Sequence, residues 1–485
     1  MVNTANSLNV VSIFSGCGGL DLGVANAGSD RLSTDLTDSR FNFVWSNDVM
    51  EHACRTLADN FDKNLVVEED EYAQENSVFC GDVRDVNFAN ITDKNIDVVM
   101  GGFPCQDFSI LRGDDNRQGV KVERGRLYLE FVRSLAELQP QMFVAENVKG
   151  LVSANDGKAY ERILKDFTNL SNSWSEIEEE LEDKEDSNAD FQITTEIEGY
   201  TILHSDVVDF STLGVPQGRE RLVLIGLRDD LTDQIDVEDI SETIEDNLSG
   251  QRNLDNYPIT PLEAFEGDTL GNLDEKYKEV MEMYEDYVDV LDSERAKEFR
   301  SSVWPKYEFD VWADYFWRNG LDKTETHDRD MIDSAHTETL TEAGYFGESL
   351  EDKTFEDGSN EEMREQSHVL ERLRHIMPDE NHQIVKDTEH HVSGMMSNIY
   401  RRTHPLQPSP TIIASGGGGT WGYHYERERG KLTNRERARI QAFPDDFLFD
   451  GTNSEVRKQI GNAVPPLGAK KVGEEVLTVL DTISD

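Results

Sequence analysis

Cysteine is scarce in this sequence. Four cysteines occur among the 485 residues: Cys17, Cys54, Cys80 and Cys105. None of them forms a Cys-x-x-Cys pair, so neither a disulfide framework nor a thiolate zinc site is expected. His382, His390 and His391 also lack the tight His-x-x-x-His spacing of a metal site. We therefore expect a chain that binds no metal and works in a reducing compartment.

Long apolar runs are also missing. No run approaches the roughly 20 residues needed to span a bilayer. The N-terminus lacks the basic region followed by an apolar stretch that marks a secretory signal. Apolar residues make up 37% of the chain, which is enough for globular cores, and 485 residues usually divide into two or more domains. We expect a monomeric, cytoplasmic protein with more than one domain.

Basic residues are few relative to acidic ones. Lysine and arginine total 47, against 98 for aspartate and glutamate, and the formal net charge is -51. A disordered acidic protein is one interpretation, but the regular apolar segments along the chain argue against it. We interpret the composition as that of a halophilic protein, whose dense carboxylate surface stays hydrated in a high-salt cytoplasm.

The first 230 residues alternate strand-like and helix-like segments. Helical patterns occupy residues 20–27 and 49–61, and short apolar runs predict strands at residues 10–14, 43–46, 78–80, 96–100, 142–145 and 222–227. This alternation predicts an α/β fold with a doubly wound, Rossmann-like parallel sheet. Ligands of such sheets bind at the carboxyl ends of the strands. The residues at those ends are therefore the candidates for function.

The alternation stops after residue 228. Residues 171–199 are already polar and acidic, which is typical of a solvated helix or a surface insertion. Residues 273–299 read as an acidic helical stretch. An aromatic cluster follows: Trp304, Tyr307, Phe309, Trp312, Tyr315, Phe316 and Trp317. A base-stacking platform is one interpretation of these rings, but we favour the core of a second domain.

Strong local signals return near the C-terminus. Thr433 and Glu436 have the spacing of a capping box, which predicts a helix that runs towards Phe443. A final amphipathic helix is expected over residues 467–480. No internal repeat accompanies these elements.

A glycine-rich turn follows the first strand. Gly16, Gly18 and Gly19 allow the backbone to approach a ligand at a helix N-terminus. The next expected glycine of the dinucleotide fingerprint is replaced by aspartate. Asp48 ends the second strand, where it could accept ribose hydroxyls, and Asp82 follows the third, where it could accept from an adenine amine. An adenosine-bearing cofactor is one interpretation, and a tight turn with two helix-capping aspartates is the other.

Cys105 ends the fourth strand, directly after Pro104. Proline fixes the turn, and a thiol that faces a helix N-terminus has a lowered pKa. Polar residues follow, which favours a cleft over the alternative of a buried structural cysteine. Residues 114–125 predict a mobile loop, and an ordinary surface loop is equally compatible with them. Its candidate hinges and phosphate contacts are Gly113, Gly119, Gly125, Arg112, Arg117 and Arg124.

Two more groups of candidate residues lie at the ends of predicted strands. Glu146 would place a partly buried carboxyl in the same cleft as Cys105, with a raised pKa suited to proton donation. Arg219 and Arg221 alternate along an extended chain, so both point to the same side, towards a base carbonyl or a phosphate. Each has a structural alternative. Residues 146–147 could be a helix-capping pair, and the two arginines could form a surface salt bridge with the glutamate between them.

Taken together and in this order, the motifs resemble those of the cytosine-5 DNA methyltransferases. Seven motifs carry the resemblance: Phe14 to Leu20, Asn47-Asp48, Gly81 to Val83, Gly102 to Gln106, Glu146 to Val148, Gln217 to Arg221 and Gly461 to Val464. They cover roughly residues 9–228 and 400–482. The resemblance implies a methyltransferase domain formed by residues 1–228 and 400–485, with a smaller target-recognition domain over residues 229–399.

The resemblance implies a covalent mechanism. The thiolate of Cys105 would add to carbon 6 of a cytosine flipped out of duplex DNA, which makes carbon 5 nucleophilic. Glu146 would hold a proton at ring N3, and Arg221, supported by Arg219, would lie at O2. Carbon 5 would then accept the methyl group of S-adenosyl-L-methionine, a base would remove the carbon 5 proton, and the cysteine would leave by elimination. No metal is needed, and the loop after Cys105 would close on the flipped base.

The resemblance also implies a cofactor site. Its residues are Phe14, Gly16, Gly18, Gly19, Leu20, Asp48, Val49, Asp82, Val83 and Asn462. Phe14 is expected to pack on the adenine ring, and Asn462 to support the site and the closing loop. Asp48 stands where the family more often has glutamate, which shortens its reach to the ribose.

Double-stranded DNA is the implied partner, with a cognate restriction endonuclease as a candidate companion. A transfer RNA cytosine-5 methyltransferase on the same scaffold is the alternative enzyme, and a catalytically inactive DNA-binding regulator is the other alternative. The long middle region favours an enzyme that recognises a DNA sequence over one that acts on transfer RNA. The presence of Cys105, Glu146 and Arg221 favours an active enzyme over an inactive regulator. Because the Debye length is about 3 Å at about 1 M salt, we expect this acidic chain to act on DNA mainly at high ionic strength.

Overall fold

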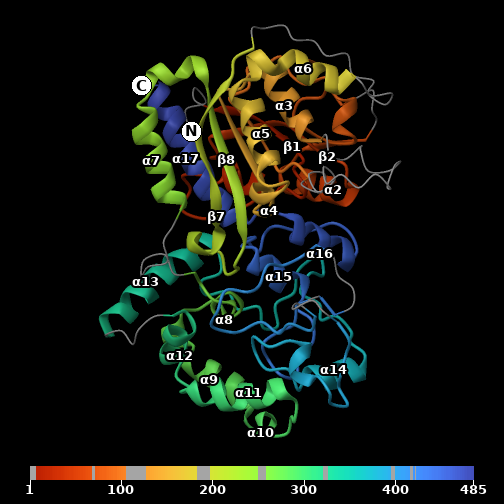
Figure 1. Cartoon of the computed structure of the whole chain (residues 1–485), viewed down its shortest axis with the longest axis vertical. Helices are drawn as coiled ribbons and strands as arrows, with labels where there is room; N and C mark the ends of the chain where they lie inside the picture. Colours follow the sequence, from red (N-terminus) through yellow and green to blue (C-terminus); the bar gives the residue numbers. More distant parts are fainter. Residues whose placement is uncertain are drawn as a thin grey trace.

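The structure is a computed structural model. It describes residues 7–67, 72–104, 127–182, 197–249, 258–320, 326–394, 399–414, 419–420 and 422–484. Figure 1 shows a sheet flanked by helices, from which a second, mostly helical part extends. In the described ranges, no helix combines the length and the apolarity that a bilayer crossing requires.

Eight strands form one sheet, in the spatial order β3-β4-β2-β1-β5-β6-β8-β7. The strands are β1 (Leu8–Ile13), β2 (Phe41–Asp48), β3 (Asn64–Val66), β4 (Ser77–Cys80), β5 (Val98–Gly101), β6 (Met142–Val148), β7 (Tyr200–Asp209) and β8 (Glu220–Arg228). The pairs from β3 to β6 are parallel, whereas β8 is antiparallel to both β6 and β7. The predicted α/β class is confirmed, and each of the six predicted strands is present.

The sheet departs from the predicted parallel arrangement at one edge. Only residues 210–219 join β7 to β8, with a 3₁₀ turn at Phe210–Leu213. Parallel neighbours need a crossover of about a dozen residues or more, usually a helix, so these two strands pair antiparallel. The pattern also misses β7, which follows directly on the acidic segment, and β3, which is only 3 residues long.

Successive side chains of the central strands enter two different cores. On β1, Val10 and Val11 are both fully buried, but they belong to separate apolar clusters on opposite faces of the sheet. The first face packs against α1 (Gly19–Ala25), α2 (Glu51–Asn60), α7 (Val237–Leu248) and α17 (Pro466–Ser484), and the second against α3 (Leu127–Leu138), α5 (Lys158–Thr168) and α6 (Leu170–Glu182). Figure 1 shows α7 and α17 on one side of the sheet and α3, α5 and α6 on the other. Burial on both faces is what a parallel sheet requires.

α6 lies in the segment that the sequence predicts to be solvated. Glu176 and Glu179 do face solvent, but Trp174, Ile177 and Leu181 are buried in the second core. Their spacing of three and four residues places them on one stripe of the helix. The first half of the acidic segment is therefore a packed amphipathic helix.

The end of the chain returns to its beginning. α17, which confirms the predicted final helix, packs along α1. A Cβ atom on Gly23 of α1 would lie only 2.3 Å from the Pro466 carbonyl oxygen and 2.4 Å from the Ala469 Cβ. The two helices therefore approach closely because position 23 has no side chain.

The middle of the chain is built from short helices. They are α8 (Pro261–Glu266), α9 (Asp274–Glu282), α10 (Glu285–Val288), α11 (Glu294–Ser302), α12 (Val311–Arg318), α13 (Thr326–Ala343) and α14 (Ser367–Leu373). Tyr307, Trp312, Tyr315 and Phe316 are buried there, and the other rings of the aromatic cluster pack against the same core. The interpretation of these rings as core residues is confirmed.

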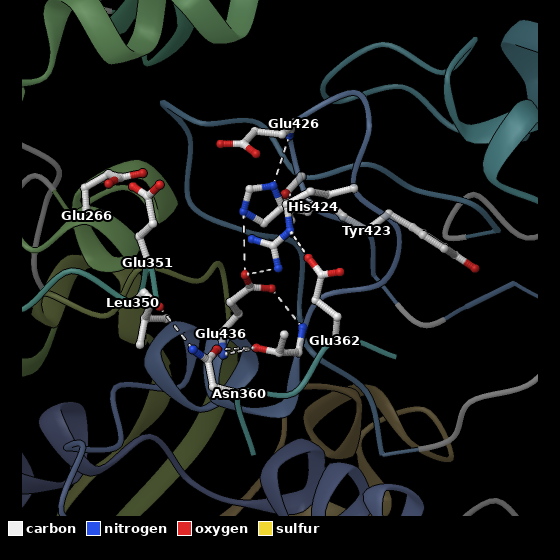
Figure 2. A network of polar contacts seen from close by, with 12 residues as sticks. Glu266, Leu350, Glu351, Asn360, Glu362, Tyr423, His424, Glu426 and Glu436 are labelled. Atoms are coloured by element: carbon white, nitrogen blue, oxygen red, sulfur yellow. Dashed lines mark hydrogen bonds and ion pairs between the residues drawn. The ribbon is translucent and has the colours of Figure 1, made fainter. Parts of the chain in front are cut away.

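A polar network centred on Glu436 connects α15 (Asn434–Ile440) to neighbouring segments, as Figure 2 shows. One carboxylate oxygen of Glu436 accepts the backbone N–H of Thr433 at 2.8 Å, and the other lies 2.7 Å from Arg429 Nη2. The Thr433 hydroxyl donates to Asn360 Oδ1 at 3.1 Å. The predicted capping box at Thr433 and Glu436 is confirmed.

His424 takes part in this network as a neutral ring. Burial holds the pKa of His424 well below its usual range, and the nearby Arg429 and Arg402 lower it further. Nδ1 accepts the backbone N–H of Glu426 at 3.0 Å, so Nε2 carries the proton and faces Glu436 Oε1 at 3.6 Å. The network thereby fixes residues 424–436 relative to α15.

Candidate active site

The carboxyl ends of the parallel strands meet at one edge of the sheet. Asp48 is the last residue of β2, and Glu146 lies near the end of β6. Because β8 runs in the opposite direction, its first residues lie at this same edge, and Arg221 is paired with Val148 of β6. The antiparallel orientation of β8 is what brings Arg221 to the edge where Glu146 lies.

Glu146 and Arg221 form an ion pair at this edge. Glu146 Oε1 lies 2.9 Å from Arg221 Nε, and each side chain is 14% exposed. Burial raises the pKa of Glu146 more than Arg221 and Arg219 lower it. The carboxyl therefore keeps a proton to higher pH than a solvated glutamate, which suits a group that donates a proton or a hydrogen bond.

Arg219 is almost fully buried next to this pair, at 1% exposed. Its two terminal nitrogens donate to the Gly461 carbonyl oxygen at 3.3 Å each, and Nη1 also donates to the Ile412 carbonyl oxygen at 3.4 Å. Burial lowers the pKa of Arg219 to about 9, and Arg221 contributes to the lowering. Arg219 remains a cation at neutral pH, and it ties the start of β8 to segments from the last part of the chain.

Cys105 lies outside the described residues, as does the loop predicted at residues 114–125. The chain that leads to Cys105 is fixed beside Glu146. A Cβ atom on Gly102 would lie 3.0 Å from Glu146 Oε2. Phe103 is buried, and its carbonyl oxygen accepts from Asn147 Nδ2 at 2.9 Å. Asn147 therefore positions the segment that enters Cys105, a role that its place in the motif alone does not indicate.

The glycine turn after β1 forms an open cradle. Gly16 has φ +57°, and a Cβ atom built there would meet nothing within 4 Å. Gly18 has φ +91°, and a Cβ atom there would lie 2.4 Å from Leu57 Cδ1. Phe14 also adopts a positive φ, 55°, which is a strained conformation for an aromatic residue. Open space thus lies beside the half-buried Gly16, whereas Gly18 is packed closely.

Asp48 and Asp82 lie at the ends of β2 and β4. Asp48 accepts the backbone N–H of Gly16 at 2.9 Å and that of Met50 at 2.8 Å, and burial raises the pKa of its carboxyl. Asp82 caps the 3₁₀ turn at Val83–Asp85 and pairs with the guanidinium of Arg84. Asp82 therefore makes the capping contact of the alternative interpretation, whereas Asp48 caps no helix and connects the glycine turn to β2.

The remaining cofactor candidates divide into two groups. Leu20 and Val83 are buried in the two opposite cores. Val49 is 70% exposed, and Asn462 is exposed at the end of α16 (Asn453–Asn462). Only the second group presents its side chains at the surface. Among the described residues, no group of three or more histidine, cysteine, aspartate or glutamate side chains is placed to hold a metal ion.

Gln217 is a site residue whose role the sequence analysis missed. It is fully buried, its Nε2 donates to Gln441 Oε1 at 2.8 Å, and its Oε1 accepts the backbone N–H of Ile412 at 2.6 Å. It therefore joins the entry of β8 to α15 and to residues 409–412. Its presence in the motif that contains Arg219 is the only sequence signal that could have indicated this role.

Replacing Gly19 with alanine is expected to lower the free energy of unfolding by about 1–3 kcal/mol, as overpacking of a tight contact does. A Cβ atom there would lie 2.4 Å from the Val464 carbonyl oxygen and 3.2 Å from Phe443 Cζ, so α1 must shift. Gly150→Ala is the matched control, because a Cβ atom at Gly150 meets nothing within 4 Å. Denaturant unfolding of both variants would test this, and equal midpoints for Gly19→Ala and the wild type would contradict it.

Comparisons with known proteins identify the family of the chain. The profile of the C-5 cytosine-specific DNA methylase family matches residues 8–175 and 181–478. DNA (cytosine-5-)-methyltransferase M.ApeKI of Aeropyrum pernix is 45% identical to this chain, and the match covers 98% of this chain and 99% of the relative. Type II methyltransferase M.NgoFVII of Neisseria gonorrhoeae is 31% identical, and the match covers 98% of this chain and 88% of that relative. The crystal structure of a prophage-encoded DNA modification methyltransferase from Escherichia coli shares the fold, with a TM-score of 0.52 at 22% identity over 98% of this chain and 100% of that one. The chain therefore belongs to the C-5 cytosine-specific DNA methylase family.

Proposed function

We propose that this chain is a DNA (cytosine-5-)-methyltransferase. It transfers a methyl group from S-adenosyl-L-methionine to carbon 5 of a cytosine that is flipped out of a specific double-stranded DNA sequence. The observation that carries this proposal is the ion pair of Glu146 and Arg221, 2.9 Å apart at the edge of the sheet where the chain enters Cys105. The names of the relatives at 45% and 31% identity support the same reaction class.

The ion pair suits the polar edge of cytosine. Ring N3 and the carbonyl O2 are attached to the same ring carbon, so one side of the base presents two adjacent acceptors. Glu146, with its raised pKa, holds a proton or hydrogen bond at N3, and Arg221 donates to O2. Arg219 supports the pair with a second buried positive charge. Both interactions strengthen as negative charge builds up on the ring, which is the condition for catalysis.

Cys105 is the nucleophile in this proposal. Its thiolate forms a bond to carbon 6, which breaks the carbon 5–carbon 6 double bond and moves electron density to carbon 5. After carbon 5 has been methylated, a base removes its proton, and the bond to Cys105 breaks to restore the double bond. The buried Phe103 and the hydrogen bond from Asn147 support a fixed approach of the chain to this position.

The open cradle at Gly16 supports the cofactor assignment, because a Cβ atom built there would meet nothing within 4 Å. S-adenosyl-L-methionine supplies the electrophilic methyl group when bound. Asp48, at the end of β2, would accept from the ribose hydroxyls, and Asp82, which follows β4, would accept from the adenine amine. Phe14 and Val49 offer apolar surface to the adenine ring. The binding set is completed by Gly18, Gly19, Leu20, Val83 and Asn462.

Residues 1–228 and 400–485 form the catalytic domain, to whose sheet α7 is also packed, and the rest of residues 229–399 forms the target-recognition domain that reads the duplex. The packing of α17 along α1 supports a catalytic domain that is discontinuous in sequence. The target carbon lies inside the duplex, so the cytosine must be flipped out to reach Cys105. The Type II names of the relatives support pairing with a restriction endonuclease. The enzyme acts as a monomer in the cytoplasm.

Methylation assays with labelled S-adenosyl-L-methionine test the proposal directly. Duplex DNA of mixed sequence and transfer RNA are offered separately, and bisulfite sequencing of the DNA product locates the modified base. Label in duplex DNA, at one position of a short motif, is the expected result. Label in transfer RNA alone, or in adenine, would overturn the proposal.

Methylation is expected to become faster, not slower, as KCl rises from about 0.1 M to about 1 M. A protein of net charge -51 repels DNA, and the Debye length falls from about 10 Å to about 3 Å over this range. An ordinary DNA-binding protein loses affinity over the same range. The unfolding midpoint at each salt concentration separates folding from DNA binding. A steady fall in the methylation rate at a constant folded fraction would reject the proposal that the enzyme works in a high-salt cytoplasm.

A further inference from the structure

Two cysteine side chains meet next to the proposed cofactor site. Cys54 lies on α2, and Cys80 is the last residue of β4. Cys80 is paired in register with Asp48, the last residue of β2. Both cysteines pack into the same apolar core, on one face of the sheet. The fold therefore brings together two thiols that no local sequence motif pairs.

The backbone of Asp48 connects the two cysteines. The Cys54 thiol contacts the Asp48 carbonyl oxygen at 3.2 Å, and the backbone N–H of Gly81, the residue after Cys80, donates to the same oxygen at 3.1 Å. The thiols also interact directly, since a hydrogen bond to the other thiol is the largest influence on the pKa of each. Both are free thiols in the structure. Their sulfur atoms are thus neighbours that a small movement can join.

The two thiols differ in exposure and in acidity. Cys54 is fully buried, whereas Cys80 is half-buried. The hydrogen bond with the Cys54 thiol lowers the pKa of Cys80 against the opposing effects of burial and Asp48, and the same contact raises the pKa of Cys54. Cys80 is therefore the thiol that loses its proton first and meets small molecules from solvent. Redox-sensing cysteines have this character: a reactive, accessible thiol beside a second thiol that resolves it.

We propose that Cys54 and Cys80 form a reversible disulfide on exposure to a peroxide, and that this disulfide weakens the binding of S-adenosyl-L-methionine. The thiolate of Cys80 attacks one oxygen of hydrogen peroxide and becomes a sulfenic acid. The O–O bond breaks, and the other oxygen leaves as hydroxide, which takes up the proton that Cys80 released.

The second step closes the disulfide. The thiol of Cys54 loses its proton and attacks the Cys80 sulfur, the S–O bond breaks, and the hydroxide that leaves takes up this proton to form water. The two thiols are oxidised by two electrons in all, and the peroxide is reduced to two molecules of water. Disulfides in a reducing cytoplasm are usually transient and redox-sensing, so a reducing compartment agrees with this role.

The disulfide affects the cofactor site through Asp48. The inference rests on the proposed function, in which Asp48 and Asp82 bind the adenosine part of the cofactor. A disulfide holds its sulfur atoms about 2 Å apart, so α2 and β4 must approach each other, and the contact of Cys54 with the Asp48 carbonyl oxygen is lost. Gly81, which donates to the same oxygen, directly precedes Asp82. The expected effect is therefore on cofactor affinity and not on the ion pair of the base site.

The test uses the full chain, first reduced and then exposed to hydrogen peroxide. Peptide mapping by mass spectrometry identifies any cross-linked cysteines. A titration with S-adenosyl-L-methionine gives its Kd before oxidation, after oxidation and after reduction with dithiothreitol. Cys54→Ala and Cys80→Ala each remove one half of the pair, and the unfolding midpoint of each reduced variant shows whether it is folded. Cys105→Ala keeps the pair but lacks the proposed nucleophile, so it separates the two sites of oxidation.

In the wild type and in Cys105→Ala, peroxide is expected to link Cys54 to Cys80 and to raise the Kd about 5- to 100-fold, the usual size of coupling between two sites. Dithiothreitol should restore the original Kd. In Cys54→Ala and Cys80→Ala, peroxide should leave the Kd unchanged.

The absence of this cross-link, or a cross-link to another cysteine, would overturn the inference. An unchanged Kd in the cross-linked protein would overturn it as well, as would an equal rise of the Kd in both alanine variants. Failure of the reduced wild type to bind S-adenosyl-L-methionine would instead overturn the proposed function, and the peptide map would still decide whether the two thiols pair.

Discussion

Cys105→Ala is expected to reduce methyl transfer to DNA by more than about 10³-fold, because the covalent route through carbon 6 is lost. Binding of S-adenosyl-L-methionine should remain within about twofold of the wild type. The cofactor is proposed to bind at Gly16 and Asp48, whose described contacts are with each other and with the backbone of Met50. Single-turnover rates and a cofactor titration measure the two effects separately.

A covalent trap makes this prediction sharper. A duplex with 5-fluorocytosine at the target position has no proton on carbon 5 to lose, so the elimination step stops and the enzyme stays attached to DNA. The wild type should form this adduct, and Cys105→Ala should not. Cys80→Ala is the matched control, since Cys80 is a half-buried thiol at the end of β4, and it should form the adduct normally. Equal activity of the wild type and Cys105→Ala would reject the covalent mechanism.

The edge of the sheet that holds the proposed site could be predicted from the sequence because its residues lie at strand ends. Short buried runs mark β1, β2, β5 and β6, and in a parallel sheet all their carboxyl ends meet at one edge. That rule alone brings Asp48 and Glu146 together with the residues before Cys105. The motifs then supply the chemistry of each position, and the ion pair of Glu146 with Arg221 agrees with it.

Long-range pairing could not be predicted in the same way. Nothing in the local pattern of β8 states that it runs antiparallel, although this direction places Arg221 opposite Val148. The buried contacts of Gln217 with Gln441 and Ile412 join positions about 200 residues apart. Such contacts depend on the folded topology, and no periodicity in the sequence encodes them.

Glu146→Gln is expected to lower kcat by about 10²- to 10³-fold, the range found for a lost general acid. Glutamine has nearly the same shape and can still approach N3, but its amide cannot deliver a proton. The cofactor KM should change little, because the cradle at Gly16 does not include Glu146. Steady-state kinetics on duplex DNA would separate kcat from KM. Loss of cofactor binding in this variant would contradict a purely catalytic role.

The pH profile distinguishes proton donation from simple packing. Burial raises the pKa of Glu146, so the protonated form is fully present below the ordinary pKa of glutamate and is lost as the pH rises through the raised value. The wild-type rate should therefore fall on the alkaline side of its optimum as Glu146 loses its proton. Deprotonation of Cys105 has the opposite effect on the rate, because it forms the nucleophilic thiolate. In Glu146→Gln this alkaline fall should disappear, leaving a low rate that only rises with pH. An unchanged alkaline limb in the variant would assign the proton to another group and leave Glu146 as the partner that orients Arg221.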